Sequence, residues 1–211
     1  DKDGAEETQK LALQKGAEAQ IYNLSLEKGD EIQDFCEKIN LFSSPDILIN
    51  NAAFAQKKDF MSINDDDMEK MLSVNLKAPF RLSQYFIPNM KVKGWGRIIN
   101  ISSIGGQWGG IHQVHYALSK AALINLTRSL AKLYSKDGII SSSITPGIID
   151  TAMTSETLGH SIDQELLSQI PIGRLGTSEE VAKAVKYLSS DEAAYLSGIT
   201  LNMNGGMYFN S

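Results

Sequence analysis

The chain has 211 residues, of which 42% are hydrophobic and 21% charged, a composition that fits one globular domain of ordinary size. Its net charge of −5 argues against nucleic acid as a main partner, because nucleic-acid-binding surfaces carry clustered positive charge. The single cysteine, Cys36, excludes an internal disulfide, the first residues contain no apolar signal-peptide core, and no apolar run approaches the length of a membrane span, so we expect a cytoplasmic protein.

The N-terminal part of the chain predicts helices and strands in alternation. Residues 3–15 carry a helical pattern, and the run AEAQIYNL at 17–24 predicts a short strand. An amphipathic helix follows at 27–41, and DILIN at 46–50 is a continuous apolar run. Such a run is typical of a strand that is buried on both faces of a parallel sheet.

The middle of the chain predicts two long helices on either side of another buried strand. Asn64 can cap a helix over about 65–90, with an adjustment at Pro79 because proline lacks a backbone N–H. GRIINIS at 96–102 predicts the strand, and 113–136 is the longest uninterrupted helical pattern. Helices of this kind between strands are typical of the crossovers of a parallel sheet.

The last part of the chain predicts two strands, one helix and a polar segment. IISSSIT at 139–145 has the pattern of a strand, and the polar, mixed stretch at 151–170 predicts a flexible helical flap. Residues 178–189 predict a helix, and ITLNMN at 199–204 predicts the final strand. Strands and helices therefore alternate along the chain, which predicts an α/β fold around a parallel sheet.

Polar residues stand at the carboxyl ends of successive predicted strands. Asn50 and Asn51 end one strand, Ser102 and Ser103 end the next, and Pro146-Gly147 follows a third. Ligands of parallel sheets bind beyond the carboxyl ends of the strands. We therefore predict a ligand site at this edge of the sheet.

Tyr116 and Lys120 share one face of the helix predicted at 113–136, because residues four apart on a helix are neighbours. Taken alone, such a pair is most often a plain surface contact. In a site, a nearby ammonium lowers the pKa of a phenol from its ordinary value of about 10 toward the range of a proton donor at neutral pH. No metal site is predicted, since the run Asp65–Asp67 is better explained as the acidic first turn of a helix.

Short motifs along nearly the whole chain resemble those of the short-chain dehydrogenase/reductase family. In chain order they are NNAA at 50–53, VNL at 74–76, ISS at 101–103, the pair Tyr116-x-x-x-Lys120, and PGIIDT at 146–151. Within the family, the tail at 170–208 resembles 3-oxoacyl-[acyl-carrier-protein] reductases. The stretch at 53–60 departs from them, because it lacks the arginine-aspartate that commonly follows there.

The resemblance implies a Rossmann-like, doubly wound parallel sheet in a single domain over residues 1–211. It also implies reduction of a carbonyl to a secondary alcohol by NADP or NAD, with NADP slightly favoured. In the most similar branch the substrate is a 3-oxoacyl chain on acyl-carrier protein, in fatty-acid synthesis. The catalytic residues implied are Asn75, Ser103, Tyr116 and Lys120.

By the same resemblance each catalytic residue has an expected role. Tyr116 would supply the proton, and Lys120 would tune it and hold the nicotinamide ribose. Ser103 would bond the substrate oxygen and stabilise its developing charge. Asn75 would hold a water that relays protons to solvent.

The resemblance implies a set of cofactor contacts as well. Asn23 and Leu24 occupy the place of the family's adenine contact, Pro146-Gly147 would shape the nicotinamide pocket, and Thr151 would bond the carboxamide or pyrophosphate. The residues expected at the cofactor are Asn23, Leu24, Asn50, Ala52, Tyr116, Lys120, Pro146, Gly147, Ile148 and Thr151.

The glycine-rich motif T-G-x-x-x-G-x-G, which opens the family's cofactor site, does not occur in this sequence. The stretch at 1–4 resembles the region just beyond the family's second strand. We therefore expect a β-α-β segment of roughly 30–40 residues to precede Asp1 in the parent protein. Its two strands would lie between 17–24 and 46–50 in the sheet.

The resemblance also implies partners. The family usually forms homotetramers through its two long helices, here about 65–90 and 113–136. Acyl-carrier proteins are acidic and dock on basic patches, so we expect docking near the basic helix ends. The residues there are Lys91, Lys93, Arg97 and Lys136.

Two other functions stay open at the level of sequence. One is a dehydrogenase that acts on a small alcohol, a sugar or a steroid. The other is a non-catalytic binding or regulatory relative, which the complete set of Asn75, Ser103, Tyr116 and Lys120 argues against. The absent glycine-rich motif is the only feature that supports a non-catalytic role.

Overall fold

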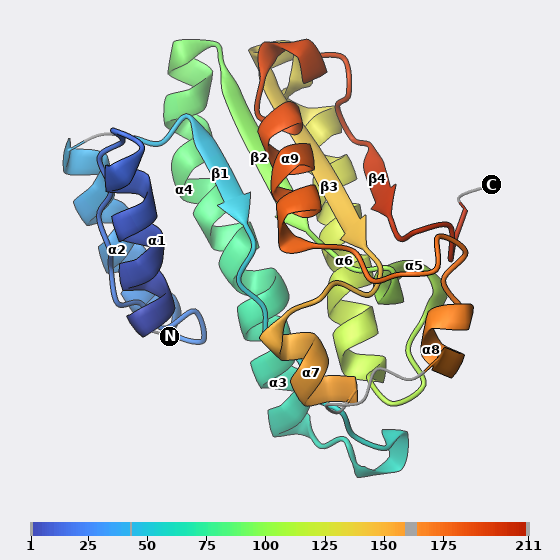
Figure 1. Cartoon of the computed structure of the whole chain (residues 1–211). Helices are drawn as coiled ribbons and strands as arrows, with labels where there is room; N and C mark the ends of the chain where they lie inside the picture. Colours follow the sequence, from blue (N-terminus) through green and yellow to red (C-terminus); the bar gives the residue numbers. More distant parts are fainter. Residues whose placement is uncertain (1, 43, 159–163, 210–211) are drawn as a thin grey trace.

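The computed structural model describes residues 2–42, 44–158 and 164–209. Its strands form one parallel sheet in the order β1-β2-β3-β4. The strands are β1 (Ile47–Asn50), β2 (Gly96–Ile101), β3 (Ile139–Pro146) and β4 (Thr200–Met203). All four were predicted, and their parallel pairing confirms the predicted α/β sheet (Figure 1).

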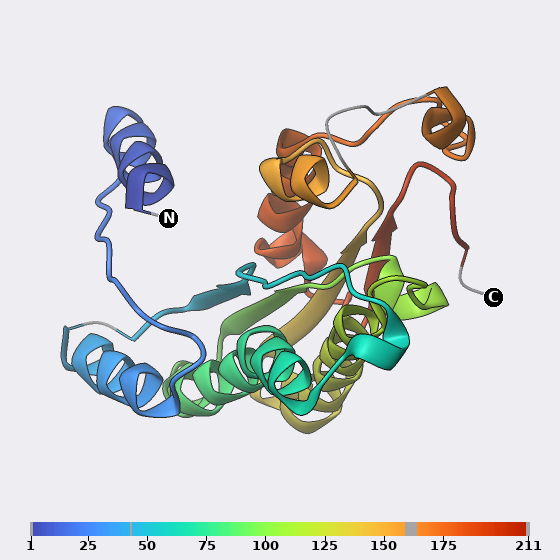
Figure 2. The ribbon, with the colours of Figure 1, turned by 90° about the horizontal axis from the view of Figure 1, so that it is seen from below.

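Helices cover both faces of the sheet, as a doubly wound fold requires (Figure 2). On one face lie α2 (Gly29–Phe42), α4 (Ala78–Lys93) and α6 (Val114–Tyr134), and on the other lies α9 (Ser178–Leu188). Each of these helices was predicted. Buried strands with helices on both faces place the carboxyl ends of the strands at one open edge of the sheet.

Side chains on the two faces of β2 pack into two separate hydrophobic clusters. Ile98 packs into the cluster under α2, α4 and α6, whereas Ile99 and Ile101 pack into the cluster under α9. Successive side chains of a strand point to opposite faces, so this division follows from the sequence alternation. It explains why the run at 96–102 is apolar throughout.

The structure divides the helix predicted at about 65–90 into three segments. Asn64 caps α3 (Asp65–Leu72) with its side chain, and a π-helical turn, η2 (Ser73–Lys77), joins α3 to α4. The adjustment that was predicted at Pro79 is this π-helical turn, which ends just before Pro79. Proline has no N–H for the α-helical bond to the carbonyl four residues earlier, and a π turn is one way in which a helix absorbs such a change.

The strand predicted at 17–24 is wrong. This segment forms no strand, Ile21 is exposed, and the chain runs extended outside the sheet between α1 (Lys2–Gln14) and α2 (Figure 2). A strand needs partners for its backbone N–H and C=O groups, and the described part of the chain offers none beside 17–24. The outer edge of β1 likewise pairs with no described strand.

The polar segment predicted as a helical flap holds α7 (Ala152–Leu158) and α8 (Gln164–Ser168). The rest of the prediction, at 159–163, lies outside the described residues. The sequence did not predict α5 (Gly105–Trp108), a short helix in the glycine-rich loop after β2. No helix in the described ranges is long and apolar enough to cross a membrane, and no described cluster of side chains could hold a metal ion.

The first testable prediction concerns a close turn beneath the sheet. Gly138 has a φ of 78°, and a Cβ there would lie 2.0 Å from the Gly94 carbonyl oxygen. Gly138→Ala should lower the free energy of unfolding by about 2–5 kcal/mol, the sum of a left-handed backbone and an overpacked contact. Gly94→Ala is the matched control, because Gly94 has a φ of 66° but open space around it. Chemical denaturation should show the smaller loss for Gly94→Ala, and equal losses would contradict the close contact.

Candidate active site

Tyr116 and Lys120 lie on the first turns of α6, and Lys120 is buried. The Lys120 Nζ donates a hydrogen bond of 2.8 Å to the carbonyl of Ile101, at the end of β2. It lies 5.7 Å from the centroid of the Tyr116 ring. The amine therefore lies inside the molecule at the carboxyl edge of the sheet, beside a partly exposed phenol ring, and the pair is not a plain surface contact.

Burial shifts the pKa values of both groups. It lowers the pKa of Lys120 to about 8, because the charged amine loses hydration. It raises the pKa of Tyr116, while a hydrogen bond with the Ser103 side chain acts in the opposite direction. That Lys120 lowers the pKa of Tyr116 stays a prediction, since in the chain alone burial is the largest effect on Tyr116.

The end of β2 is tied to α6 through serine side chains. The Ser102 hydroxyl donates to the Lys120 carbonyl at 2.8 Å and is buried. The Ser103 hydroxyl accepts from the Gly105 N–H at 3.1 Å and is partly exposed beside Tyr116. One serine thus fixes the helix that carries the amine, and the other keeps a hydroxyl at the accessible edge.

Asn75 is 1% exposed, and its side chain holds the loop after β1. Its Oδ1 accepts from the Phe54 N–H at 2.8 Å, and its Nδ2 donates to the Phe54 carbonyl at 2.9 Å and to the Ser119 hydroxyl at 3.0 Å. Ser119 in turn donates to the Tyr116 carbonyl at 2.7 Å. The Asn75 amide is therefore fully occupied, and it links the loop after β1 to the turn that carries Tyr116.

Glycines let the surrounding loops approach this centre closely. A Cβ on Gly106 would lie 2.7 Å from the backbone carbon of Lys120, so α5 rests directly on α6. A Cβ on Gly147 would lie 2.8 Å from the Cα of Asn204, so the turn after β3 rests on the chain that follows β4. Gly106 therefore serves a close contact between two helices.

The predicted cofactor contacts fall into two groups. Ala52 is exposed, and Thr151 and Pro146 are partly exposed, at the carboxyl edge of the sheet. Asn50 is 6% exposed and donates at 2.8 Å to Asn100, which donates to Thr127 on α6. The Asn50 side chain therefore serves the core, and sequence reasoning did not foresee this use.

Asn23 and Leu24 do not join the centre. Asn23 is exposed in the extended segment before α2, and Leu24 packs against the cluster under α2 and α4. Their predicted position at the end of a strand is wrong, because 17–24 is not a strand. Their contact with the adenine stays a prediction.

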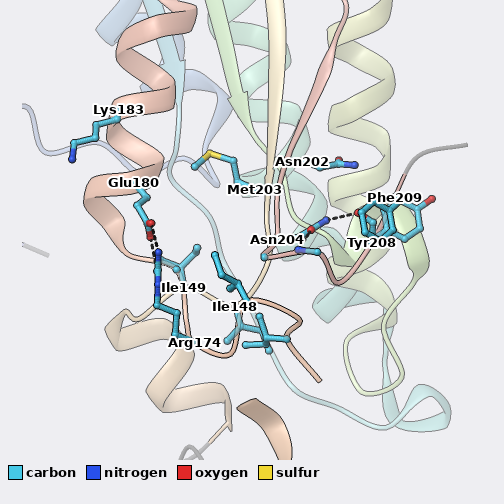
Figure 3. A pocket seen from close by; sticks show the side chains of 15 residues that line it. Ile148, Ile149, Arg174, Glu180, Lys183, Asn202, Met203, Asn204, Tyr208 and Phe209 are labelled. Atoms are coloured by element: carbon cyan, nitrogen blue, oxygen red, sulfur yellow. Dashed lines mark hydrogen bonds and ion pairs between the residues drawn. The ribbon is translucent and has the colours of Figure 1, made fainter. Parts of the chain in front are cut away.

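A cavity of about 770 Å³ lies between α9 and the end of β4 (Figure 3). Among the predicted site residues that Figure 3 labels, Ile148 lines it. Arg174 and Glu180 form a two-bond ion pair across one wall, at 2.7 and 3.0 Å. The four catalytic candidates do not line this cavity.

The described residues fit the nicotinamide end of a dinucleotide. A lysine ammonium has three donors, and one of those of Lys120 is used by Ile101, so two can reach ribose hydroxyls. The narrow Gly147 turn and the partly exposed Ser103 lie at the same edge of the sheet. For the pyrophosphate end, the sequence does not contain the glycine-rich motif T-G-x-x-x-G-x-G.

Comparison with known proteins gives the same result. A family model described as enoyl-(acyl carrier protein) reductase matches residues 1–208. The 3-oxoacyl-[acyl-carrier-protein] reductase FabG of Escherichia coli (strain K12) is 40% identical over 194 residues, which cover 92% of this chain and 79% of FabG. The chain belongs to the short-chain dehydrogenase/reductase family. The FabG of Aquifex aeolicus (strain VF5) is 38% identical over 201 residues, 95% of this chain and 81% of that protein.

Solved structures of short-chain dehydrogenases share the fold. A putative NAD(P) dependent gluconate 5-dehydrogenase from Beutenbergia cavernae, with bound NADP, has a TM-score of 0.92 at 30% identity and covers 97% of this chain and 83% of its own. A 4-hydroxyisoleucine dehydrogenase complexed with NADH has a TM-score of 0.84 at 30% identity, over 92% of this chain and 80% of its own. The protein is therefore an NAD(P)-dependent short-chain dehydrogenase/reductase, as predicted.

The second prediction tests the phenol. Tyr116→Phe keeps the ring and its packing but removes the transferable proton, so kcat should fall by roughly 10²–10⁴-fold. Cofactor affinity should change little. Steady-state kinetics and nucleotide titration of the full-length protein measure both. Tyr195→Phe, at a fully exposed tyrosine, is the control for the same chemical change. Near-normal turnover of Tyr116→Phe would exclude the phenol as the acid.

The third prediction tests the buried amine through the pH dependence of stability. Unfolded Lys120 keeps its proton up to about pH 10.5, whereas the folded protein loses it near pH 8. The unfolded state therefore binds more protons between these values, and this residue makes the free energy of unfolding rise with pH across that window. Lys120→Met should remove the rise and weaken cofactor binding.

The matched control for Lys120→Met is Lys183→Met, at an exposed lysine of α9. Denaturant unfolding at a series of pH values should show the wild-type rise in this control. A Lys120→Met protein with an unchanged pH dependence would show that Lys120 is not buried as the structure has it.

Proposed function

We propose that this enzyme reduces the keto group of a 3-oxoacyl chain carried on acyl-carrier protein. The observation that carries the proposal is the buried Lys120 amine beside Tyr116 at the carboxyl edge of the sheet. That geometry supports carbonyl reduction in general. The similarity to FabG enzymes over more than nine tenths of the chain supports this particular substrate class.

The proposed roles of the residues follow from their positions. When bound, the reduced nicotinamide supplies a hydride to the carbonyl carbon. The Tyr116 phenol gives its proton to the carbonyl oxygen, which completes the secondary alcohol, and the Ser103 hydroxyl donates a hydrogen bond to the same oxygen. Lys120 holds the ribose hydroxyls and stabilises the phenolate left on Tyr116. Donors fixed in a dry site lose little free energy to reorganisation, which is why their burial favours catalysis.

The proposed proton relay at Asn75 is assigned to the backbone instead of the side chain. The side-chain amide is occupied by Phe54 and Ser119. Pro79 has no N–H, so the Asn75 carbonyl cannot receive the α-helical bond from the residue four positions later. The loss of that α-helical bond supports an Asn75 carbonyl that accepts from a water in the proposed relay.

A dehydrogenase of a small sugar acid or alcohol is the second candidate function. The specific observation in its favour is the TM-score of 0.92 with the gluconate 5-dehydrogenase, which exceeds that with the 4-hydroxyisoleucine enzyme. Both solved relatives are 30% identical to this chain, below the 38–40% of the FabG proteins. The sequence relationship therefore favours the acyl substrate.

The basic patch expected to dock acyl-carrier protein is smaller than the sequence suggested. Arg97 is 2% exposed and bonds Asp191, so its expected contribution to docking is wrong. Lys91 pairs with Asp137, and Lys93 pairs with Asp46, which directly precedes β1. Lys136, in η3 (Ser135–Asp137), keeps the proposed docking role.

We also propose that the protein assembles as a homotetramer. Large apolar side chains stand exposed on the two helices through which the family was expected to assemble, at Phe80 on α4 and at Leu118 and Leu133 on α6. Exposed apolar patches of this kind commonly mark subunit contacts. Sedimentation of the full-length protein would test the assembly.

The fourth prediction compares substrates on the full-length enzyme. The kcat/KM for a 3-oxoacyl chain on acyl-carrier protein should exceed that for a small 3-oxoacyl thioester, and both should exceed that for oxidation of gluconate or 4-hydroxyisoleucine. Reduced nicotinamide absorbance measures all four. A preference for either hydroxy acid would favour the second function.

Charge reversal separates docking from chemistry in the same experiment. Lys136→Glu should raise KM for the carrier-linked substrate and leave the small thioester unaffected, because only the acidic carrier meets the new charge. Lys15→Glu is the matched control, at an exposed lysine beyond α1. Equal effects of Lys136→Glu on both substrates would remove the docking role.

A further inference from the structure

The segment that leaves β1 is held at every second residue, by Asn75, by α6 and by the loop before α6. Phe54 is held through Asn75, and Asn75 reaches the first turn of α6 through Ser119. The side chain of Gln56 bonds His115, at 2.9 Å. The backbone N–H of Lys58 donates to the carbonyl of His112, which precedes α6, at 2.8 Å. We call residues 54–58 the strap.

Asp67, in the first turn of α3, anchors the strap. Its carboxylate pairs with the Lys58 ammonium, accepts from the Gln56 Nε2 at 3.0 Å, and accepts from the Asn64 N–H at 3.0 Å. The hydrogen bond from Lys58, then those from Asn64 and Gln56, lower the pKa of Asp67 to about 2. Asp67 is therefore ionised at neutral pH and acts only as an acceptor.

The ionised Asp67 determines which way the Gln56 amide points. An acceptor-only partner requires the NH₂ group, so the Gln56 Nε2 faces Asp67 and its Oε1 faces the ring of His115. The carbonyl oxygen of an amide has no proton to give. The His115 Nε2, at 2.9 Å from it, must therefore carry the hydrogen.

His115 is 0% exposed, and its other ring nitrogen supports the same assignment. Among the described residues, the buried Nδ1 has no hydrogen-bond partner. With the proton on Nδ1 instead, that buried N–H would lack an acceptor, and two acceptors, the His115 Nε2 and the Gln56 Oε1, would face each other at 2.9 Å. Burial also lowers the pKa of His115, with Asp67 and Lys58 acting in opposite directions. The ring is neutral, with its proton on Nε2.

We propose that His115 is a positioning residue, which the Gln56–Asp67–Lys58 network uses to fix the first turn of α6 and with it the phenol of Tyr116. The N-cap of α6, Gln113, makes no side-chain cap and has a non-helical backbone. Helix ends without caps fray, and Tyr116 is the third residue of this helix. The inference rests on the carbonyl reduction proposed above, because its purpose is the placement of the acid.

Kinetics of the full-length enzyme test the proposal. Gln56→Leu and His115→Leu should each lower kcat by roughly 10- to 100-fold, the scale of a misplaced catalytic group, with KM and cofactor affinity unchanged. His115→Gln can donate from its own amide to Gln56 and should restore most of the turnover. Gln33→Leu is the matched control, since Gln33 also bonds a carboxylate, Glu37, on the outer surface of α2.

Two further measurements do not depend on turnover. Histidine ¹⁵N resonances should show His115 as a neutral ring with hydrogen on Nε2, and tyrosine ¹³Cζ titration should show the Tyr116 pKa moving toward its ordinary value in Gln56→Leu. The move is expected because an opened turn admits water to Tyr116, while Lys120 remains its charged neighbour.

The outcomes separate this proposal from the proposed function. An Nδ1–H ring, or a Tyr116 titration unchanged in both leucine variants, would overturn the positioning role whatever the substrate is. A wild-type enzyme that reduces no 3-oxoacyl chain would refute the substrate proposal alone. In that case the two resonance measurements still decide the role of His115.

Discussion

The site depends on keeping the amine of Lys120 out of water at the carboxyl edge of the sheet. A buried ammonium loses its hydration, at a cost of several kcal/mol, and contacts with the protein must offset this cost. The structure supplies one such contact from the Ile101 carbonyl and closes the surroundings with α5, whose Gly106 lies against the backbone of Lys120. Burial lowers the pKa of Lys120 only to about 8, which is still above neutral pH, so the amine remains a charged neighbour of Tyr116. Binding of a nucleotide ribose would add acceptors that the chain alone does not provide.

The periodicity of the sequence was enough to predict the strands of the sheet and the helices that cover it, because each buries a continuous apolar face. The structure places Ser103 just beyond β2 and Tyr116 and Lys120 on α6, as the motifs indicated, while the catalytic roles of these residues stay predictions. The segment at 17–24 was misread for a physical reason. A strand is stable only beside a partner, and its alternating pattern says nothing about whether a partner is present.

Side-chain networks were beyond the reach of sequence patterns. The VNL motif marked Asn75 as functional, but not that its amide binds Phe54 and Ser119 instead of water. His115, directly before the tyrosine, belongs to none of the sequence motifs that indicated the site. Only the fold shows that the chain from 54 to 58, which departs from the reductase pattern, comes to lie against that histidine.

The positions of Tyr116 and Lys120 on α6 explain why the loop after β1 is so heavily bonded. Lys120 lies two turns inside a helix of 21 residues, where backbone hydrogen bonds on both sides hold it. Tyr116 lies in the first turn, where N–H groups lack intrahelical partners and the helix is least stable. In the proposed arrangement, the bonds to Ser119 and His115 hold this first turn, so that fraying does not separate Tyr116 from Lys120. Two side chains four residues apart on a helix keep their spacing while both turns stay folded, and the proposed bonds would extend that order to the turn of Tyr116.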